Sequence, residues 1–203
     1  MSTPEQIAKE LLDRAGTTYA ENAGITLKDT PMPLFQLLVL CMLASKPIDA
    51  DTAVRAAREL FEAGLRTPES VLKAHRRTMI AAFGRAGYAR YDESSATRLT
   101  EMAQTMRDTY DGDLRKLAEA SGENVEQAAQ LLQEFKGIGA TGAAIFLREV
   151  QAVWPWVQPY FDDRARSTAS ELGLPSDADK LAELAPRRTA ELAAALVRTS
   201  LAS

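Results

Sequence analysis

The sequence predicts a tight turn at Gly137, Ile138 and Gly139, between two helical segments. An acidic pair, Asp162 and Asp163, follows later in the chain. Glycine makes positive φ available at both positions, so the chain can reverse sharply while Ile138 packs back between the helices. The second helix would begin near Ala140, and its unpaired N–H groups and positive dipole end would attract an anion such as phosphate. The turn alone also fits an ordinary helical hairpin in which Gly137 ends the first helix. Short motifs occur often by chance, so the turn taken alone favours that plainer interpretation.

Any further chemistry must come from carboxylates, hydroxyls or amines, because the chain has one cysteine and one histidine. Cys41 lies in the apolar run FQLLVLCMLA, where a free cysteine acts as a small hydrophobic residue. A single cysteine cannot form an internal disulfide, a thiolate zinc site or a four-cysteine iron–sulfur cluster. His75 alone cannot build a histidine metal cluster. We therefore expect no metal held by side chains and no iron–sulfur cluster.

Composition and charge are those of an ordinary globular protein. The chain has 203 residues, of which 46% are hydrophobic and 26% charged, enough for one large domain or two small lobes. A net charge of −4 and a pI near 5.2 argue against nonspecific coating of nucleic acid, but they allow a local site of backbone amides and a few arginines. The N-terminus is acidic and no apolar run is long enough to span a membrane. We expect a soluble, cytoplasmic monomer without a membrane partner, associated with the nucleoid if the source is bacterial.

Apolar residues recur at three- and four-residue spacings, which predicts an all-α protein of about ten helices without a strand. Cap signals support the helix starts, among them Ser2 or Thr3 before Pro4 and Asp49 or Asp51. The helix at 33–44 is apolar nearly all round and is expected to be central and buried. The other helices are expected at residues 4–20, 51–62, 68–74, 78–83, 92–110, 113–120, 125–135, 140–153, 163–172 and 186–201, with a further short helix that starts at Ser176 or Asp177.

In these elements the sequence resembles the helix-hairpin-helix (HhH-GPD) DNA glycosylases of the endonuclease III and 3-methyladenine DNA glycosylase superfamily. The matching pieces cover most of the chain: LxxFxGIGxxxA at 132–143, FDDRARSTASELGL at 161–174, PLFQLLVLCMLASKPID from residue 33 and GRAGYARYDESSATRL from residue 84. The resemblance implies two all-α lobes. Residues 32–148 would form a helical barrel containing the helix-hairpin-helix at about 125–150, and residues 1–31 with 149–203 would form a second lobe carrying the candidate catalytic aspartate.

The resemblance also implies a function in base excision repair of double-stranded DNA. The hairpin would grip a phosphate, often through a monovalent cation, K⁺ or Na⁺, on its carbonyls, and the target base would be flipped into the cleft. The aspartate would face the positive charge that develops on the sugar, or activate water. Counting back from the Leu-Gly-Leu turn at 172–174, the matching position is Asp162, with Asp163 as the fallback if the register shifts by one. Either aspartate also fits a simple helix cap.

One departure from the family pattern narrows the expected activity. Bifunctional members carry a lysine two residues after the second glycine of the hairpin, and this chain has Thr141 there. A hydroxyl cannot form the Schiff base that lyase chemistry uses, so we expect a monofunctional glycosylase that leaves an abasic site. The alternatives are a catalytically silent helix-hairpin-helix DNA-binding protein and, if the hairpin is a plain turn, a helical interaction module without nucleic acid.

Other predicted site residues follow the same resemblance, and each has an ordinary structural alternative. Arg164 and Arg166 would touch phosphate or pair with the Asp162 carboxylate and depress its pKa. Trp154, Trp156 and Tyr160 would stack on the extruded base or pack between the lobes. The predicted DNA contacts are the hairpin residues Lys136, Gly137, Ile138, Gly139 and Ala140, the gap-filling candidates Lys46 and Tyr88, and a basic patch of His75, Arg76, Arg77, Arg85, Arg90 and Arg98.

Overall fold

The structure is a computed structural model that describes residues 2–202. In that range the chain is all-helical, with no strand. Two short 3₁₀ turns, η1 (Ala89–Tyr91) and η2 (Pro155–Val157), accompany the α-helices. These are α1 (Pro4–Ala15), α2 (Tyr19–Asn22), α3 (Pro31–Ala44), α4 (Ala50–Glu62), α5 (Pro68–Lys73), α6 (Arg76–Arg85), α7 (Asp92–Tyr110), α8 (Arg115–Ala120), α9 (Val125–Leu132), α10 (Ala140–Val150), α11 (Asp163–Glu171), α12 (Ala178–Glu183) and α13 (Thr189–Ala202).

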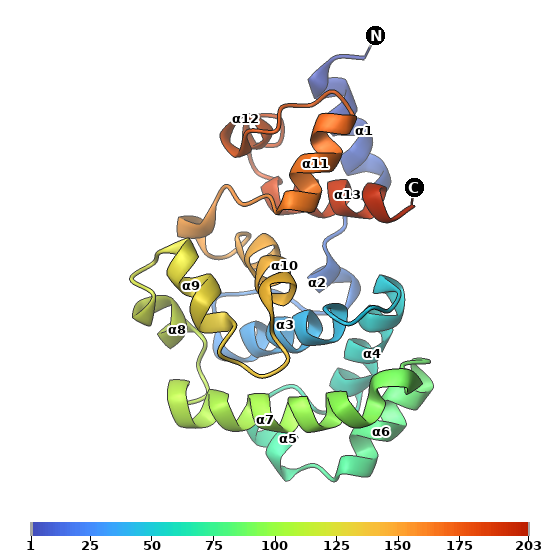
Figure 1. Cartoon of the computed structure of the whole chain (residues 1–203), viewed down its shortest axis with the longest axis vertical. Coiled ribbons are helices and arrows are strands. Elements are labelled where there is room, and N and C mark those ends of the chain that lie inside the picture. The colour runs from blue at the N-terminus through green and yellow to red at the C-terminus, as the bar shows by residue number, and fades with distance from the viewer. Residues whose placement is uncertain (1, 203) are drawn as a thin grey trace.

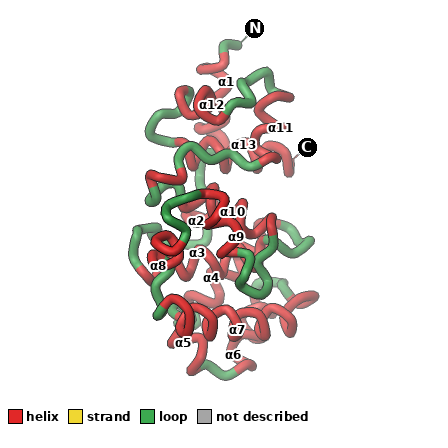
Figure 2. Tube along the Cα trace, turned by 60° about the vertical axis from the view of Figure 1, so that its left-hand side comes forward, coloured by secondary structure: helices red, strands yellow, loops and turns green. Residues whose placement is uncertain are grey.

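The helices gather in two groups along an elongated molecule (Figure 1). The barrel group consists of α3 to α10, and the terminal group consists of α1, α11, α12 and α13. In the terminal group α1 and α11 both pack on α13, and α10 reaches across from the barrel group to contact α13. Figure 2 shows the long connection from α10 to α11 running between the groups. The boundary predicted between residues 148 and 149 therefore falls inside α10, the helix that joins the two groups.

The predicted central helix is confirmed in α3. Every side chain from position 33 to 43 of this helix is buried, which explains why its sequence is apolar on all sides. Helices α4 and α10 pack against it. Cys41 lies in this core, and burial raises the pKa of its thiol well above the ordinary value. The cysteine therefore acts as a core side chain, as the sequence indicated.

Several helix boundaries differ from the expectation because local caps intervene. The first helix ends at Ala15 rather than near position 20, since Gly16 ends it and Thr18 caps the separate helix α2 by accepting a hydrogen bond from Glu21 N at 3.2 Å. Helix α9 ends at Leu132, before the predicted end at position 135. Between residues 2 and 202, α2 is the one α-helix that none of the expected ranges describes as a separate element. None of the helices between residues 2 and 202 is both long and apolar enough to cross a membrane.

Candidate functional site

The hairpin between α9 and α10 has one left-handed glycine. Gly137 has φ of +94°, and a Cβ placed on it would lie 3.2 Å from Met42 Cγ and 3.4 Å from the Arg98 side chain. Gly139 has φ of −99°, so the expected use of positive φ at both glycines is wrong for this position. Ile138 is buried between the helices, as expected, and packs against Gly142. The turn therefore requires glycine at position 137 for its backbone and close packing, but not at position 139.

The start of α10 presents free backbone donors. The N–H groups of Gly139, Ala140, Thr141 and Gly142 have no acceptor within residues 2–202, and the first helical bond runs from Ala143 N to Gly139 O at 3.0 Å. Gly139 offers no side-chain cap, and the first turn carries no acidic residue. Gly139, Ala140 and Thr141 are exposed. This end of α10 is therefore suited to bind an anion through backbone N–H groups and the helix dipole.

Basic side chains surround the hairpin, but they already have partners. Arg98 Nη1 donates to Glu101 Oε2 at 2.9 Å, and Lys136 Nζ lies 3.6 Å from Glu101 Oε1. The hydrogen bond from Arg98 is the main cause that lowers the pKa of Glu101. Lys46 lies beside the turn, since the preceding residue, Ser45, donates to Gly137 O at 3.4 Å. The Lys46 ammonium lies 5.7 Å from the Tyr91 ring centroid. Basic side chains therefore lie around the hairpin, and two of them, Arg98 and Lys136, pair with Glu101.

Asp162 is the N-cap of α11, and both of its carboxylate oxygens are engaged. Oδ1 accepts from Ala165 N at 2.9 Å, which is the capping bond, and Oδ2 accepts from Arg148 Nη1 at 2.6 Å. The Asp162 side chain is 11% exposed and that of Arg148 is 4% exposed. Asp163 is the first residue of α11 and is exposed. Asp162 is therefore the member of the acidic pair that is held in place by other residues.

Arg148 lies in a buried polar cluster where the two helix groups meet. Its guanidinium carbon sits 5.3 Å from the Tyr19 ring centroid, and its Nε has no hydrogen-bond partner among residues 2–202. Burial works against its charge, but the Glu149 and Asp162 carboxylates raise the pKa of Arg148 above its ordinary value. Glu149 Oε1 accepts from Ala20 N at 2.7 Å, while its Oε2 is unpartnered in the same range. The cluster therefore ties α2, α10 and the start of α11 together.

The residue that sequence reasoning missed is Arg148. It occurs with Glu149 in the otherwise apolar segment AAIFLREV of α10, and an adjacent pair of opposite charges inside an apolar helix signals buried, paired groups. The predicted partners of Asp162 are wrong in this structure, because Arg164 points its Nη1 to Ser200 Oγ at 3.5 Å and Arg166 donates to Ser176 O at 2.9 Å.

The aromatic candidates separate into core and partly accessible side chains. Trp154 is 2% exposed, donates its indole N–H to Asp29 and stacks on Trp156, so it is a packing residue and not a free surface for a base. Tyr160 and Trp156 are half-buried. Burial, with the negative charge of Asp162 next in size, raises the pKa of Tyr160 to about 12. Of the three, Tyr160 therefore lies within electrostatic reach of Asp162.

Among the gap-filling candidates and the basic patch, the structure buries Tyr88 and pairs three of the arginines with carboxylates. Tyr88 is fully buried, with its hydroxyl donating to Leu43 O at 3.2 Å, so its predicted role in the gap is wrong for this conformation. Tyr91 lies nearer the surface, with Lys46 and Arg90 over its ring. The patch is also not a continuous free surface, because three of its arginines pair with carboxylates: Arg76 with Glu93, Arg85 with Glu59 and Arg98 with Glu101.

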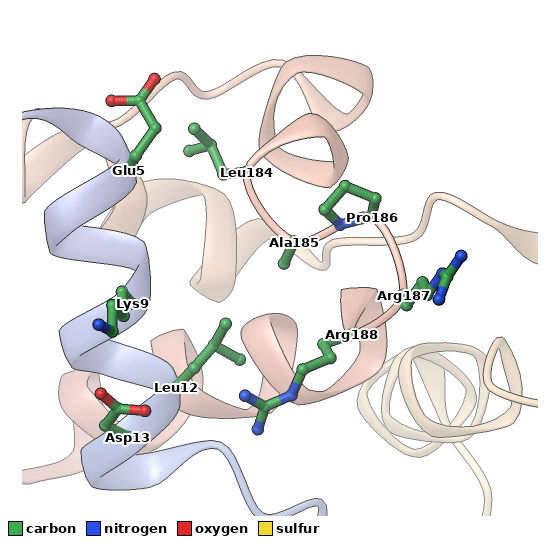
Figure 3. Close-up of a pocket in the computed structure, with 9 residues that line it drawn as sticks. All are labelled: Glu5, Lys9, Leu12, Asp13, Leu184, Ala185, Pro186, Arg187 and Arg188. Carbon is green, nitrogen blue, oxygen red and sulfur yellow. The ribbon is translucent and has the colours of Figure 1, made fainter.

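A groove of about 420 Å³ lies elsewhere, between α1 and residues 184–188 (Figure 3). Leu12 and Leu184 line it, together with Asp13 and Arg188. None of its lining residues belongs to the hairpin or to the surroundings of Asp162. Within residues 2–202, no three His, Cys, Asp or Glu side chains come together as a metal site. The hairpin and the Asp162 cluster thus remain the candidate site.

A solved structure described as a trapped endonuclease III–DNA covalent intermediate, in an estranged-adenine complex, is similar to this chain. The two share a TM-score of 0.54 over 97% of this chain and 85% of that chain, at 16% sequence identity. The chain has an endonuclease III-like helical fold. The predicted all-α fold class is therefore confirmed, and at this identity the likeness shows the fold alone. No protein-family model and no curated protein sequence matches the chain.

Proposed function

We propose that the protein is a monofunctional DNA glycosylase that hydrolyses the N-glycosidic bond of a damaged or mismatched base flipped out of double-stranded DNA. The observation that carries the proposal is the layout of α10. Its first turn presents free N–H groups, and Arg148, in its second half, holds the Asp162 carboxylate. Residues 141 and 148 are seven apart, so they share a helix face and lie about 10 Å apart along the axis. One rigid helix would thus set the phosphate grip relative to the carboxylate.

Each part would act as follows. The N–H groups at Gly139 and Ala140 would bind a DNA phosphate, and the hairpin carbonyls, among them that of Gly137, would hold a K⁺ or Na⁺ ion beside it. The carbonyl of Gly137 fits that use, because its hydrogen bond from Ser45 is long, at 3.4 Å. Asp162, held by Arg148, would stabilise the oxocarbenium-like sugar as the base departs and would take the proton of the attacking water. The endonuclease III-like fold supports this assignment.

Thr141 supports base removal without strand cleavage. It is the second residue of α10 and is exposed, so its side chain lies at the mouth of the hairpin. Its side chain carries a hydroxyl and no amine, so it cannot form a Schiff base with the sugar aldehyde. The expected product is therefore an intact strand with an abasic site.

A second candidate function is that of a catalytically silent DNA-binding protein with the same hairpin. Two observations favour it. Both oxygens of Asp162 already accept hydrogen bonds within the protein, and Glu101 already engages Arg98 and Lys136 beside the hairpin. In that case Asp162 would serve only as a helix cap and as the partner of Arg148.

The two functions separate in one experiment. Duplex oligonucleotides carrying a panel of damaged or mismatched bases are incubated with the protein, and each reaction is divided into one sample heated in alkali and one left untreated. The proposal expects strand breaks only after alkali, and loss of those breaks in Asp162→Asn. Binding to the duplexes without alkali-sensitive sites across the panel would support the silent binder. Breaks without alkali would contradict the monofunctional assignment, and loss of activity in Asp163→Asn alone would move the catalytic role by one residue.

A further inference from the structure

The contact between Arg148 and Asp162 fixes both groups before any ligand is present. Asp162 is held at Oδ1 by the Ala165 N–H and at Oδ2 by Arg148 Nη1, so rotation of the carboxylate about its own bond is restrained from two sides. Arg148 is restrained in turn by the face of the Tyr19 ring, 5.3 Å from its guanidinium carbon. The orientation of Asp162 therefore depends on α10 and α2 as well as on its own helix.

Stability alone does not account for this arrangement. Removing two charges from water is costly, and an apolar replacement of a buried ion pair is often neutral or stabilising. Here the cost is larger still, because Arg148 Nε and Glu149 Oε2 are buried in the same cluster without partners among residues 2–202. An arginine that remains charged at every accessible pH suits one purpose well, which is to hold a neighbouring carboxylate in one orientation.

We propose that Arg148 is the positioning residue of Asp162, holding its carboxylate in the orientation in which it faces the sugar of the flipped nucleotide. The inference rests on the proposed function and deepens it. Arg148 touches neither DNA nor water in this scheme and acts through Asp162. The site is thereby preorganised, since the carboxylate needs no reorientation when the glycosidic bond breaks. Without Arg148 the helix-capping bond alone would hold Asp162.

The test compares Arg148→Met and Arg148→Lys with a matched control. Arg198→Met removes a second guanidinium from the same Tyr19 ring, where it lies 4.1 Å from the centroid and donates to Thr17 O at 3.2 Å. No contact of Arg198 with Asp162 occurs in the described part of the chain. On a duplex that wild type processes, kcat and KM for base release are measured at neutral pH for wild type and each variant.

For Arg148→Met, the proposal expects kcat to fall by about 100-fold with KM little changed, because a misplaced catalytic group costs rate and not binding. Arg148→Lys should restore part of the lost kcat, because it keeps a cation beside Asp162. Arg198→Met should keep the wild-type kcat and KM. A kcat equal to or above that of wild type in both Arg148 variants would overturn the proposal. If Arg148→Met fails to fold, kcat and KM of Arg148→Lys decide.

A second readout does not need activity. Hydrogen exchange of the Ala165 amide, measured by NMR, reports how firmly Asp162 Oδ1 is held. Arg148→Met should speed exchange of this amide while α13 amides keep their protection, and Arg198→Met should not. If wild type releases no base from any duplex but the Ala165 amide behaves in this way, the glycosylase function fails while the positioning contact stands. Unchanged Ala165 exchange in Arg148→Met would sink the positioning role itself.

Discussion

The two glycines of the hairpin should respond to alanine to very different extents. Gly137 has φ of +94°, and a Cβ there would lie 3.2 Å from Met42 Cγ and 3.4 Å from Arg98 Cβ. Gly139 has φ of −99° and ψ of −165°, and a Cβ there would meet nothing within 4 Å. The pair therefore forms a matched comparison within one turn, in which the chemical change is identical and the positions differ in backbone conformation, in space and in the N-cap role of Gly139.

The magnitude follows from four contributions. Left-handed backbone costs alanine roughly 1–2 kcal/mol at position 137. Pushing a methyl group against the Met42 side chain in a packed core adds on the order of 1 kcal/mol there. Gly139 is the N-cap of α10, where alanine is a poorer cap than glycine by roughly 0.5–1 kcal/mol. The lower entropy of the unfolded chain offsets about 0.4–1 kcal/mol in both variants. Gly137→Ala should therefore lower the free energy of unfolding and Gly139→Ala should leave it nearly unchanged, with a difference between them of about 1–2 kcal/mol.

The assay is urea unfolding followed by far-UV circular dichroism, with wild type and both variants at equal protein concentration. The slope of the free energy against urea should be the same for all three proteins, so that midpoints compare directly. Gly137→Ala should unfold at lower urea than wild type, and Gly139→Ala should unfold close to the wild-type midpoint. Equal losses in the two variants would refute the assignment of positive φ and close packing to Gly137 alone.

Three further predictions concern the candidate site. Thr141→Lys should give a covalent adduct with abasic DNA that borohydride traps, since an amine replaces the hydroxyl there, and base release without any adduct would contradict the placing of this position at the sugar. Burial raises the pKa of Glu149 above 4.5 despite the opposing charge of Arg148, so the folded state binds its proton more tightly. The stability that this raised pKa contributes is complete below pH 4.5 and is lost as pH rises through the raised value. The melting temperature of Glu149→Gln should therefore rise relative to that of wild type from pH 4 to pH 7, roughly the range around and above a carboxylate's ordinary pKa. A difference in melting temperature that stays constant with pH would contradict this. Asp162→Asn should lower the pKa of Tyr160 from about 12 without returning it to 10.0, because burial is the larger cause of the shift. Phenolate absorbance, with Tyr160→Phe as the blank, measures the change. An unchanged pKa would contradict the closeness of Asp162 to Tyr160.

The fold was largely predictable because its signals are local. Helical periodicity and caps such as Thr3 and Asp49 depend on residues within one or two turns, and both residues cap helices in the structure. The buried helix α3 was visible as an apolar run. Short elements such as α2 were missed, because a four-residue helix between Gly16 and Gly24 has no periodicity of its own to detect.

The candidate site was predictable only where its geometry is local. The hairpin turn and the capping position of Asp162 follow from neighbouring residues, and the structure places both where the sequence indicated. Contacts between residues far apart in the sequence could not be predicted in this way. Arg148 donates to Asp162 only because α10 and the start of α11 lie together in the fold. For the same reason the sequence offered Tyr88 for the gap and left Trp154 open between base stacking and packing, although both lie in the core. An aromatic side chain near a turn suits either place until the neighbouring helices are known.

The central claim is that the Asp162 carboxylate removes a base from DNA, and single-turnover base release measures it most directly. Wild type, Asp162→Asn and Asp163→Asn are each held in excess over a duplex carrying the lesion that wild type processes, and alkali reveals the abasic product with time. The account predicts that Asp162→Asn, which keeps its size and a hydrogen-bonding oxygen, slows the reaction by about 100- to 10,000-fold, while Asp163→Asn stays close to wild type. An Asp162→Asn rate equal to that of wild type would contradict it.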